Sequence, residues 1–366
     1  MCASGEKMRI TIVGGGNIGT QFAVHCAEKG HNVTIYTSTP DIFKKQINIV
    51  DEKGQTTHIG EIEKATNNPE EAFSNVDCII ITWPAMVMDQ VVDPILEYSS
   101  KETKICVVPG SGGSECIFEK CIDRGNIFFG MERVPAVARL IKKGETVKSV
   151  GYRDELHISS IPIDKGQECC DLIESIFNKP CTSIPNYLNL TLTPSNSLLH
   201  TTRLRILFKD YKEGVFYDKL PLFYEEWDDE TSELLLKCDD ELQSICKALK
   251  EINLSGVKSL REHYGSYTVE EMTKKISSIE AFKGLKTPQL VCEEGLAPDF
   301  HSRYFTADFS FGLAIIKQVA DMANVEVPNI DETMKWYESL AVEHKHFNYT
   351  QYGIKSKKEL ISFYLR

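Results

Sequence analysis

The chain of 366 residues lacks several features that would assign it to a class at once. No stretch approaches the ~20 consecutive apolar residues of a membrane-spanning helix, so we expect no membrane association. Residues Met1–Lys7 lack the apolar core of a signal peptide, which favours a cytoplasmic protein. The net charge is −12 and no basic block occurs, which argues against a nucleic-acid partner.

The 12 cysteines also lack the spacing of a metal or redox motif, because no Cys-x-x-Cys occurs. Cys169 and Cys170 are adjacent, which makes them a poor pair for a mutual disulfide. Cys26, Cys78 and Cys106 lie within apolar helix or strand patterns, where cysteine behaves as a small hydrophobe. We therefore expect reduced, structural thiols and no metal site.

What the chain does contain begins with a glycine motif, Gly-Gly-Gly-Asn-Ile-Gly, between a short apolar strand and a helical pattern. Gly14 would allow a tight turn, Gly16 would let the backbone approach a pyrophosphate, and Gly19 would let helix and strand pack closely. Asn17 and Ile18 would open the helix, whose N-terminus attracts negative charge. The motif predicts a dinucleotide site; a glycine-rich turn without a ligand is the alternative.

Buried strands separated by helices or loops predict a mostly parallel, doubly wound α/β sheet with a Rossmann fold. From about residue 185 helical patterns take over. We therefore predict a dinucleotide-binding domain over residues 1–184 and an all-α domain over residues 185–366. The expected strands cover Met8–Val13, Val33–Tyr36, Asp77–Thr82, Lys104–Val108, Ile127–Gly130, Lys148–Tyr152 and Glu155–Ile158. The main expected helices cover Glu233–Leu249, Val269–Phe282, Leu313–Ala323 and Asp331–Val342.

The end of the second strand bears on the choice of cofactor. An acid at this point binds the ribose hydroxyls of NAD and repels the extra phosphate of NADP, but the first acid here is Asp41. Thr37 and Ser38 can donate to a phosphate, and Lys44 or Lys45 could reach it. We therefore favour NADPH, with NADH as the alternative.

Two further loops follow buried strands, at the edge of a parallel sheet where ligands bind. One contains Thr82 and Pro84, and the other begins at Pro109 in the sequence Pro-Gly-Ser-Gly-Gly. Both are expected to line the dinucleotide. Ordinary turn chemistry explains them equally well.

In the second half, Asn196 and His200 are four residues apart and share one face of a helix, which we expect to begin at Thr193-Pro194. Arg303 and Asp308 follow more than 100 residues later. Each alone has a structural explanation, as a packed histidine, a surface carboxylate or an ion-pairing arginine. Together they are what a dehydrogenase needs beside its nicotinamide.

In this combination and order, the motifs resemble those of the opine dehydrogenase family, which includes octopine, nopaline and N-(1-carboxyethyl)-amino-acid dehydrogenases. The resemblance extends to Glu132–Arg139, Phe223-Tyr224-Glu225 and Asp239-Asp240-Glu241. It implies a Rossmann domain followed by a helical domain, with the substrate in the cleft between them. The implied reaction condenses an amino acid with an α-keto acid, and the resulting imine takes a hydride from the nicotinamide.

The same resemblance implies roles for the residues of the second half. His200 would be the general acid–base, Asp308 would orient its ring, Arg303 would hold a substrate carboxylate and Asn196 would position substrate or nicotinamide. A homodimer is common among such dehydrogenases. The chain departs from the family at Thr201, Ala307 and Gly353-Ile354, which bears on substrate identity more than on reaction type.

Other functions share parts of this pattern. Ketopantoate reductase and glycerol-3-phosphate dehydrogenase have the same architecture, but they use a lysine with an asparagine and no histidine–aspartate pair. A nonenzymatic redox sensor that binds NADP would need the glycine loop and none of His200, Arg303 and Asp308.

Overall fold

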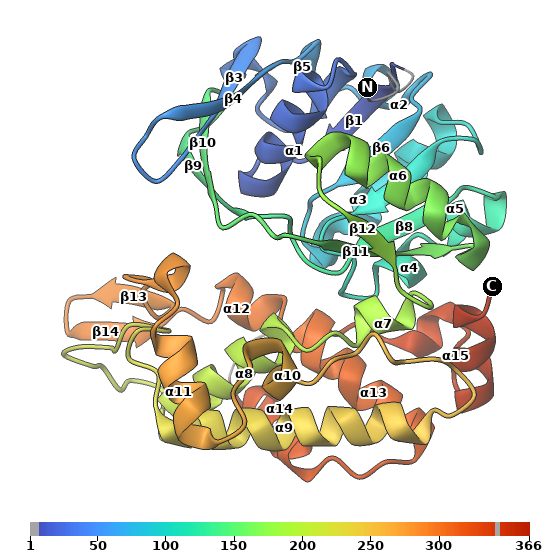
Figure 1. The fold of residues 1–366 in the computed structure, drawn as a ribbon. Coiled ribbons are helices and arrows are strands. Elements are labelled where there is room, and N and C mark those ends of the chain that lie inside the picture. Colours follow the sequence, from blue (N-terminus) through green and yellow to red (C-terminus); the bar gives the residue numbers. More distant parts are fainter. Residues whose placement is uncertain (1–6, 341–344) are drawn as a thin grey trace. The chain divides into compact units, whose positions relative to one another are not determined.

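The computed structural model describes residues 7–340 and 345–366, which form two compact units (Figure 1). The first unit extends to Thr191 and also includes Tyr364–Arg366, and the second comprises Leu192–Phe363. The sequence had suggested a boundary after residue 184. Within the described residues, no helix is long and apolar enough to cross a membrane.

The first unit is built on a sheet in the order β12-β11-β8-β7-β6-β1-β2-β5. β1 (Arg9–Val13) lies between β2 (Asn32–Tyr36) and β6 (Cys78–Ile81) and is parallel to both. β11 is antiparallel to β8, and the other neighbouring pairs are parallel. The predicted mostly parallel α/β fold is thereby confirmed. The remaining strands are β5 (Lys64–Thr66), β7 (Lys104–Val107), β8 (Phe128–Met131), β11 (Leu156–Ile161) and β12 (Cys181–Ser183).

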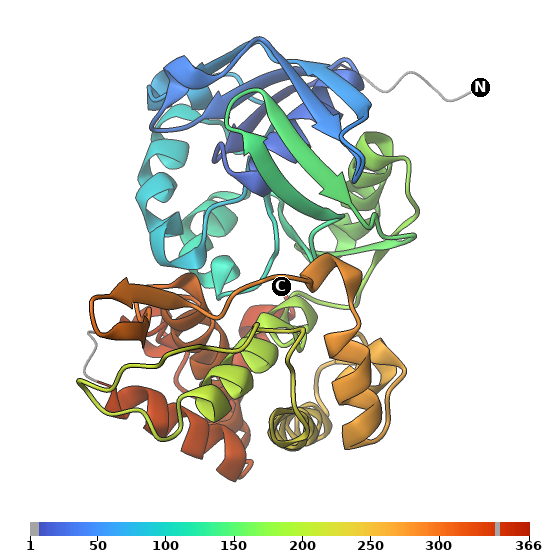
Figure 2. The same ribbon diagram turned by 90° about the vertical axis from the view of Figure 1, so that its left-hand side faces the viewer.

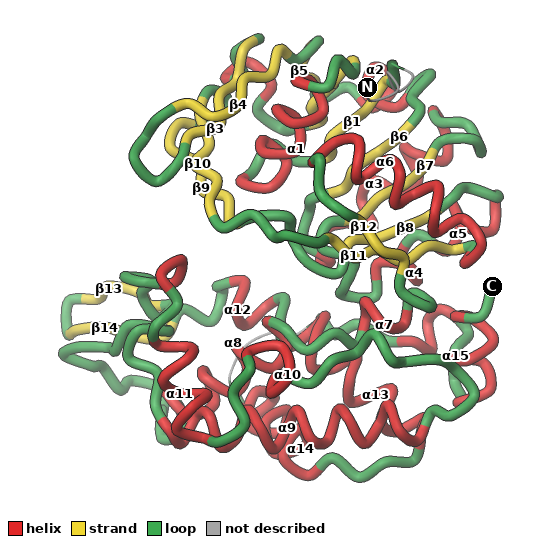
Figure 3. The backbone as a smooth tube through the Cα atoms, viewed as in Figure 1, coloured by secondary structure: helices red, strands yellow, loops and turns green. Residues whose placement is uncertain are grey.

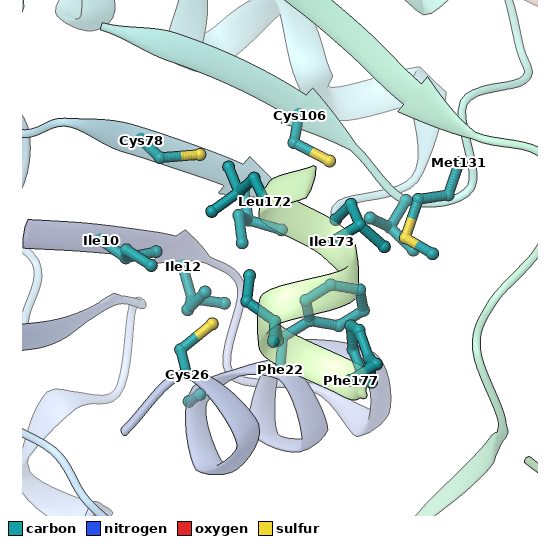
Figure 4. Close-up of a cluster of buried hydrophobic side chains, with 14 of the residues drawn as sticks. Ile10, Ile12, Phe22, Cys26, Cys78, Cys106, Met131, Leu172, Ile173 and Phe177 are labelled. Atoms are coloured by element: carbon teal, nitrogen blue, oxygen red, sulfur yellow. The ribbon is translucent and has the colours of Figure 1, made fainter. Parts of the chain in front are cut away.

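The core of this unit lies where α1 (Asn17–Glu28) and α6 (Gly166–Phe177) meet the sheet (Figure 4). Phe22 on α1 packs edge-on against Phe177 on α6, with ring centroids 4.9 Å apart. Cys26, Cys78 and Cys106 are fully buried in this cluster, and all cysteines within the described residues are free thiols. The other helices here are α2 (Pro69–Phe73), α3 (Ala85–Tyr98), α4 (Ser114–Ile117), α5 (Glu119–Arg124) and α7 (Leu188–Thr191).

A second, smaller sheet packs against α1, and its strands can be followed in Figure 2. Its order is β4-β3-β10-β9, and of these strands the sequence had predicted β10 alone. Gly60 on β4 permits the close approach, because a Cβ atom there would lie 2.7 Å from Cα of Val24 on α1. The strands are β3 (Gln46–Val50), β4 (Thr56–Glu61), β9 (Val137–Lys142) and β10 (Thr146–Val150).

The second unit is mainly helical, as predicted, with a short hairpin that was not predicted (Figure 3). α8 begins at Asn196 with Ser195 as its N-cap, so the predicted start at Thr193-Pro194 is wrong by two residues. The predicted helix ending at Val342 extends past the described residues. Its elements are α8 (Asn196–Leu207), α9 (Asp229–Ala248), α10 (Leu260–Tyr264), α11 (Val269–Ser277), β13 (Gln289–Cys292), β14 (Gly295–Pro298), α12 (Arg303–Thr306), the π-helix η4 (Phe309–Leu313), α13 (Ala314–Ala323), α14 (Pro328–Ser339) and α15 (Lys357–Tyr364).

Candidate active site

His200 lies on α8 with its side chain only 4% exposed, and both ring nitrogens have partners. Nδ1 lies 2.6 Å from Oδ2 of Asp308, which comes 108 residues later in the chain. Nε2 lies 2.5 Å from the hydroxyl of Tyr224. A carboxylate can only accept, so a neutral ring carries its proton on Nδ1 and accepts the Tyr224 hydroxyl at Nε2.

Tyr224 completes this chain of hydrogen bonds, and the sequence had assigned it no role. Burial, with a further contribution from Tyr304, raises the pKa of Tyr224 well above its ordinary value, so the phenol keeps its proton and donates. The ring of Tyr304 stacks on His200 with centroids 4.0 Å apart. In the sequence, Tyr224 appeared only as part of the Phe-Tyr-Glu motif of the family resemblance. Its role could not be predicted, because its contact with His200 depends on the fold of the intervening loop.

Arg203, one turn after His200 on α8, holds the segment that carries Tyr224. Its side chain is completely buried and its Nη1 lies 2.5 Å from Oδ2 of Asp228. Its Nε donates to the carbonyl oxygen of Phe223 over 3.1 Å. Charge-assisted bonds of this kind are among the stronger polar contacts in proteins. One helix therefore positions both the imidazole and the loop that supplies its tyrosine.

Asp308 is the residue before the π-helix η4, and Gly312 within η4 lets this segment approach α8. A Cβ atom on Gly312 would lie 2.8 Å from Cβ of Ser197, closer than real side chains come. Short π-helices are frequent at functional sites, where the wider turn redirects a side chain. This packing explains how two residues so far apart in sequence come within hydrogen-bond distance.

Arg303 and Asn196 lie in the same unit at the first positions of α12 and α8. Both residues are exposed. Within residues 7–340 and 345–366, the Arg303 guanidinium forms no ion pair, so the ion-pairing explanation for this residue finds no partner there. The structure thus brings His200 and Asp308 into contact and leaves the Arg303 guanidinium available to an anion.

The glycine loop of the first unit fits a dinucleotide. Gly14 has a φ of +112° and a Cβ there would lie 2.7 Å from Oγ1 of Thr82, so only glycine suits the turn. A Cβ on Gly19 would lie 1.8 Å from the carbonyl oxygen of Gly14. Around Gly16, by contrast, no atom of the other described residues beyond its neighbours in the chain lies within 4 Å of the Cβ position, which leaves room for a pyrophosphate.

Residues flanking this loop have structural contacts of their own. Oδ1 of Asn17 accepts from the backbone N–H of Leu140 over 2.8 Å and so ties β9 to α1. The Thr82 hydroxyl donates to the carbonyl oxygen of Val13 over 3.0 Å. Ile18 is half-buried in the first turn of α1. Pro84 directly precedes α3, and the exposed Pro109 follows β7 by two residues.

At the end of β2, hydroxyl groups rather than free cationic side chains are the candidates for binding the extra phosphate of NADP. Thr37 is buried and Ser38 is exposed. Lys44 and Lys45 lie 4.0 Å and 3.2 Å from the carboxylates of Glu145 and Glu61, respectively. Both lysines are surface groups with acidic neighbours, so the case for NADPH rests on the hydroxyls and on the missing acid.

A glycine loop on a parallel sheet, with an imidazole–carboxylate pair in a helical second unit, defines a two-domain NAD(P)-dependent oxidoreductase. Residues 183–341 match the family profile described as "NAD/NADP octopine/nopaline dehydrogenase, alpha-helical domain". Residues 10–157 match that of ketopantoate reductase PanE/ApbA. The helical half of the chain thus matches the opine dehydrogenase family, and the relatives named below are oxidoreductases that act on CH–NH bonds.

Relatives of full length agree with this assignment. The chain is 26% identical to an opine dehydrogenase of Haliotis discus hannai, over 90% of this chain and 89% of the relative. An octopine dehydrogenase of Mizuhopecten yessoensis is also 26% identical, with the same coverage. A solved octopine dehydrogenase structure has a TM-score of 0.83 and 22% identity, covering 97% of this chain and 98% of that one, and so shares the fold.

Proposed function

We propose that this chain catalyses the NAD(P)H-dependent reductive condensation of an amino acid with an α-keto acid, with His200 as general acid–base. The observation that carries the proposal is the Asp308–His200–Tyr224 chain of hydrogen bonds in the same unit as Arg303. When bound, the nicotinamide supplies the hydride that reduces the carbon–nitrogen double bond. The protein's own residues must manage the protons and hold the carboxylates.

The proton balance of the reaction defines the task of His200. The amino group must lose a proton before it attacks the keto carbon, and the hydroxyl of the adduct must gain one to leave as water. An imidazole can do both, because one ring nitrogen can exchange a proton with the substrate while the other stays bonded to Asp308. Asp308 keeps the ring oriented and stabilises the imidazolium. Since Tyr224 occupies Nε2, a substrate atom that exchanges a proton with His200 must take the place of its hydroxyl.

Arg303 and Asn196 are proposed to hold the substrate. A guanidinium pairs with a carboxylate through two parallel hydrogen bonds, a geometry that a lysine lacks. The exposed position of Arg303, five residues before Asp308, suits this role. Asn196, one turn before His200, offers an amide to a substrate or nicotinamide group. The related octopine dehydrogenase has been solved with L-arginine, agmatine or pyruvate, which supports amino-acid and keto-acid substrates here.

The dinucleotide would be held by Gly14, Gly16, Asn17, Ile18 and Gly19, with the loops at Thr82, Pro84 and Pro109 beside it. Thr37 and Ser38 would face the adenosine ribose, and we propose NADPH as the preferred form. Solved octopine dehydrogenase contains NADH and a yersinopine dehydrogenase contains NADP+, so both forms occur among proteins of this fold. A homodimer and a cytoplasmic location stay predictions.

The test is oxidation of NADPH and of NADH by the pure protein against a matrix of α-keto acids and amino acids near pH 7. Oxidation that requires both partners would support the proposal and identify the substrates together. Oxidation with a keto acid alone would indicate a 2-keto reductase. The ketopantoate reductase match does not favour that outcome, because it covers only residues 10–157 of the nucleotide-binding half.

A further inference from the structure

Two histidines and a glutamate gather at the C-terminal end of α1, within the first unit and apart from the glycine loop. His25 and Glu28 are three residues apart on α1, and His58 projects from β4. Nδ1 of His58 lies 2.8 Å from Oε2 of Glu28, and the rings of His25 and His58 have centroids 4.6 Å apart. One ligand atom from each of the three lies within 4.8 Å of the others.

The fold brings these groups together through the close packing of β4 on α1. His58 and Gly60 are two residues apart, so they lie on the same face of the strand. Gly60 allows that face to approach the helix backbone at Val24. The hydroxyl of Tyr152 also contacts the cluster, because it lies 2.9 Å from Nε2 of His25. The cluster therefore draws on a helix, a strand of the small sheet and the segment after β10.

The charges around the cluster suit a cation. His25 is only 3% exposed, so an ion bound to its ring would be largely shielded from water. The carboxylate of Glu28 adds a negative charge, and the C-terminal end of a helix carries a partial negative charge. Lys29 is exposed and its positive charge is screened by solvent.

We propose that His25, Glu28 and His58 bind one divalent transition-metal ion, with Zn²⁺ as the best fit. Two imidazoles and a carboxylate are a common ligand set for zinc, and water or Tyr152 would fill the fourth position. Tetrahedral zinc ligands lie roughly 3.3 Å apart. His58 and Glu28, whose nearest atoms are 2.8 Å apart, must therefore separate slightly, and any wider ligand pair within the 4.8 Å limit must close in. His58 and Glu28 can move, since their side chains are 32% and 36% exposed. The ion would replace the proton shared between these two residues.

Such an ion would fasten the small sheet to the helix whose other end carries the glycine loop. It takes no part in the proposed reaction, so its effect is on stability. No sequence motif indicated this site, because the ligands come from positions 25, 28 and 58 without a recognised spacing.

The experiment uses the full-length protein after treatment with a chelator. Calorimetric titration with ZnCl₂ should show one equivalent bound, and the melting temperature should rise with the ion present. Absorption of the Co²⁺-loaded protein should show d–d bands without the charge-transfer band of a thiolate ligand. No heat of binding with an unchanged melting temperature, or a thiolate band in the Co²⁺ spectrum, would overturn the proposal.

Variants locate the site. His58→Ala and Glu28→Gln should each weaken Zn²⁺ binding at least about 10-fold, since even the loss of a supporting residue has an effect of that size. Both residues are partly exposed, so either variant can serve if the other fails to fold. His157→Ala is the matched control: His157 also pairs with a glutamate, Glu132, at 3.0 Å in the same unit. Equal affinity in all three variants would mean adventitious surface binding.

Discussion

At the scale of single residues, His200 carries the proposed chemistry. We expect His200→Ala to lower kcat by about 10² to 10⁴-fold, the usual contribution of a general acid–base. Binding of NADPH should be unchanged, because the glycine loop belongs to the other unit. Steady-state kinetics with a fluorescence titration of NADPH would measure both quantities, and a melting curve would control for folding. A variant that turns over like the wild type would remove His200 from the mechanism.

Tyr224 is a positioning residue whose hydroxyl donates to Nε2 of His200. Tyr224→Phe removes a donor that favours the neutral ring, so the acid limb of the kcat/KM profile should move to higher pH. A merely structural role would lower activity equally at every pH. The measurement is kcat/KM between pH 5 and 9. Tyr217→Phe, whose ring contacts Phe208 in the same unit, is the control and should leave the profile in place.

Substitution of Arg303 should change KM for a substrate more than it changes kcat. Arg303→Lys keeps the charge and loses the paired geometry, so KM for the acid that it holds should rise about 10-fold. Arg205→Lys is the control, since Arg205 lies over the ring of Trp336 at 5.6 Å and has no proposed substrate. Varying each substrate in turn shows which carboxylate is involved. An unaltered KM for both substrates would exclude the role.

At the scale of elements, the contact between α8 and η4 sets the distance between His200 and Asp308. Gly312→Ala places a methyl group 2.8 Å from Cβ of Ser197, so the two helices must separate. We expect lower kcat and a loss of stability of about 1–3 kcal/mol, the usual range for overpacking. The double variant Gly312→Ala with Ser197→Gly removes the contacted Cβ and should recover much of both. Failure of the second change to help would place the damage elsewhere.

The same scale shows what a sequence can predict. The inner strands of the main sheet were identifiable because they are largely buried and read as apolar runs, such as residues 78–81. The three-residue edge strands β5 and β12 were missed, because they are short and partly exposed. The small sheet was largely missed, since β4 (Thr-Thr-His-Ile-Gly-Glu) is mostly exposed and has few apolar residues. The hairpin β13–β14 was missed for a different reason: each of its strands has only four residues, which is too short for a clear alternating pattern.

The site was predictable in part. His200 and Asp308 were paired through the family resemblance, because no local pattern links residues 108 positions apart. The contact of Tyr224 and the cluster of His25, Glu28 and His58 could not be predicted, because both arise where separate elements pack together. Arg203 illustrates the limit: its sequence context is an ordinary helix, yet it is completely buried and holds a loop that begins 20 residues later.

At the scale of the whole molecule, buried ionisable groups in the first unit link its stability to pH. Glu115 is completely buried, and its Oε1 accepts from the hydroxyl of Thr191 over 2.6 Å and from that of Tyr364 near the C-terminus. Burial raises the pKa of Glu115 to about 6. The pKa of His25 shifts the other way, to about 3. The two groups therefore oppose each other, and a variant is needed to separate them.

Because the pKa of Glu115 is raised in the folded state, its contribution to stability decreases as the pH rises. The folded protein holds the proton on Glu115 more tightly than the unfolded chain does. This proton therefore contributes to the free energy of unfolding below about pH 4.5, and the contribution is lost as pH rises through about 6. Glu115→Gln keeps the Oε1 acceptor and cannot ionise. Relative to the wild type it should therefore gain stability between pH 5 and pH 7.5, on the order of 1–2 kcal/mol.

Melting temperatures of both proteins at the two pH values measure this difference, and the effect of His25 cancels because it is common to both. Glu52→Gln, at an exposed position of the same unit, is the control and should show no change with pH relative to the wild type. A Glu115→Gln protein that differs from the wild type equally at pH 5 and pH 7.5 would mean that Glu115 does not titrate in this range. Its bonds to Thr191 and Tyr364 would then matter only as packing.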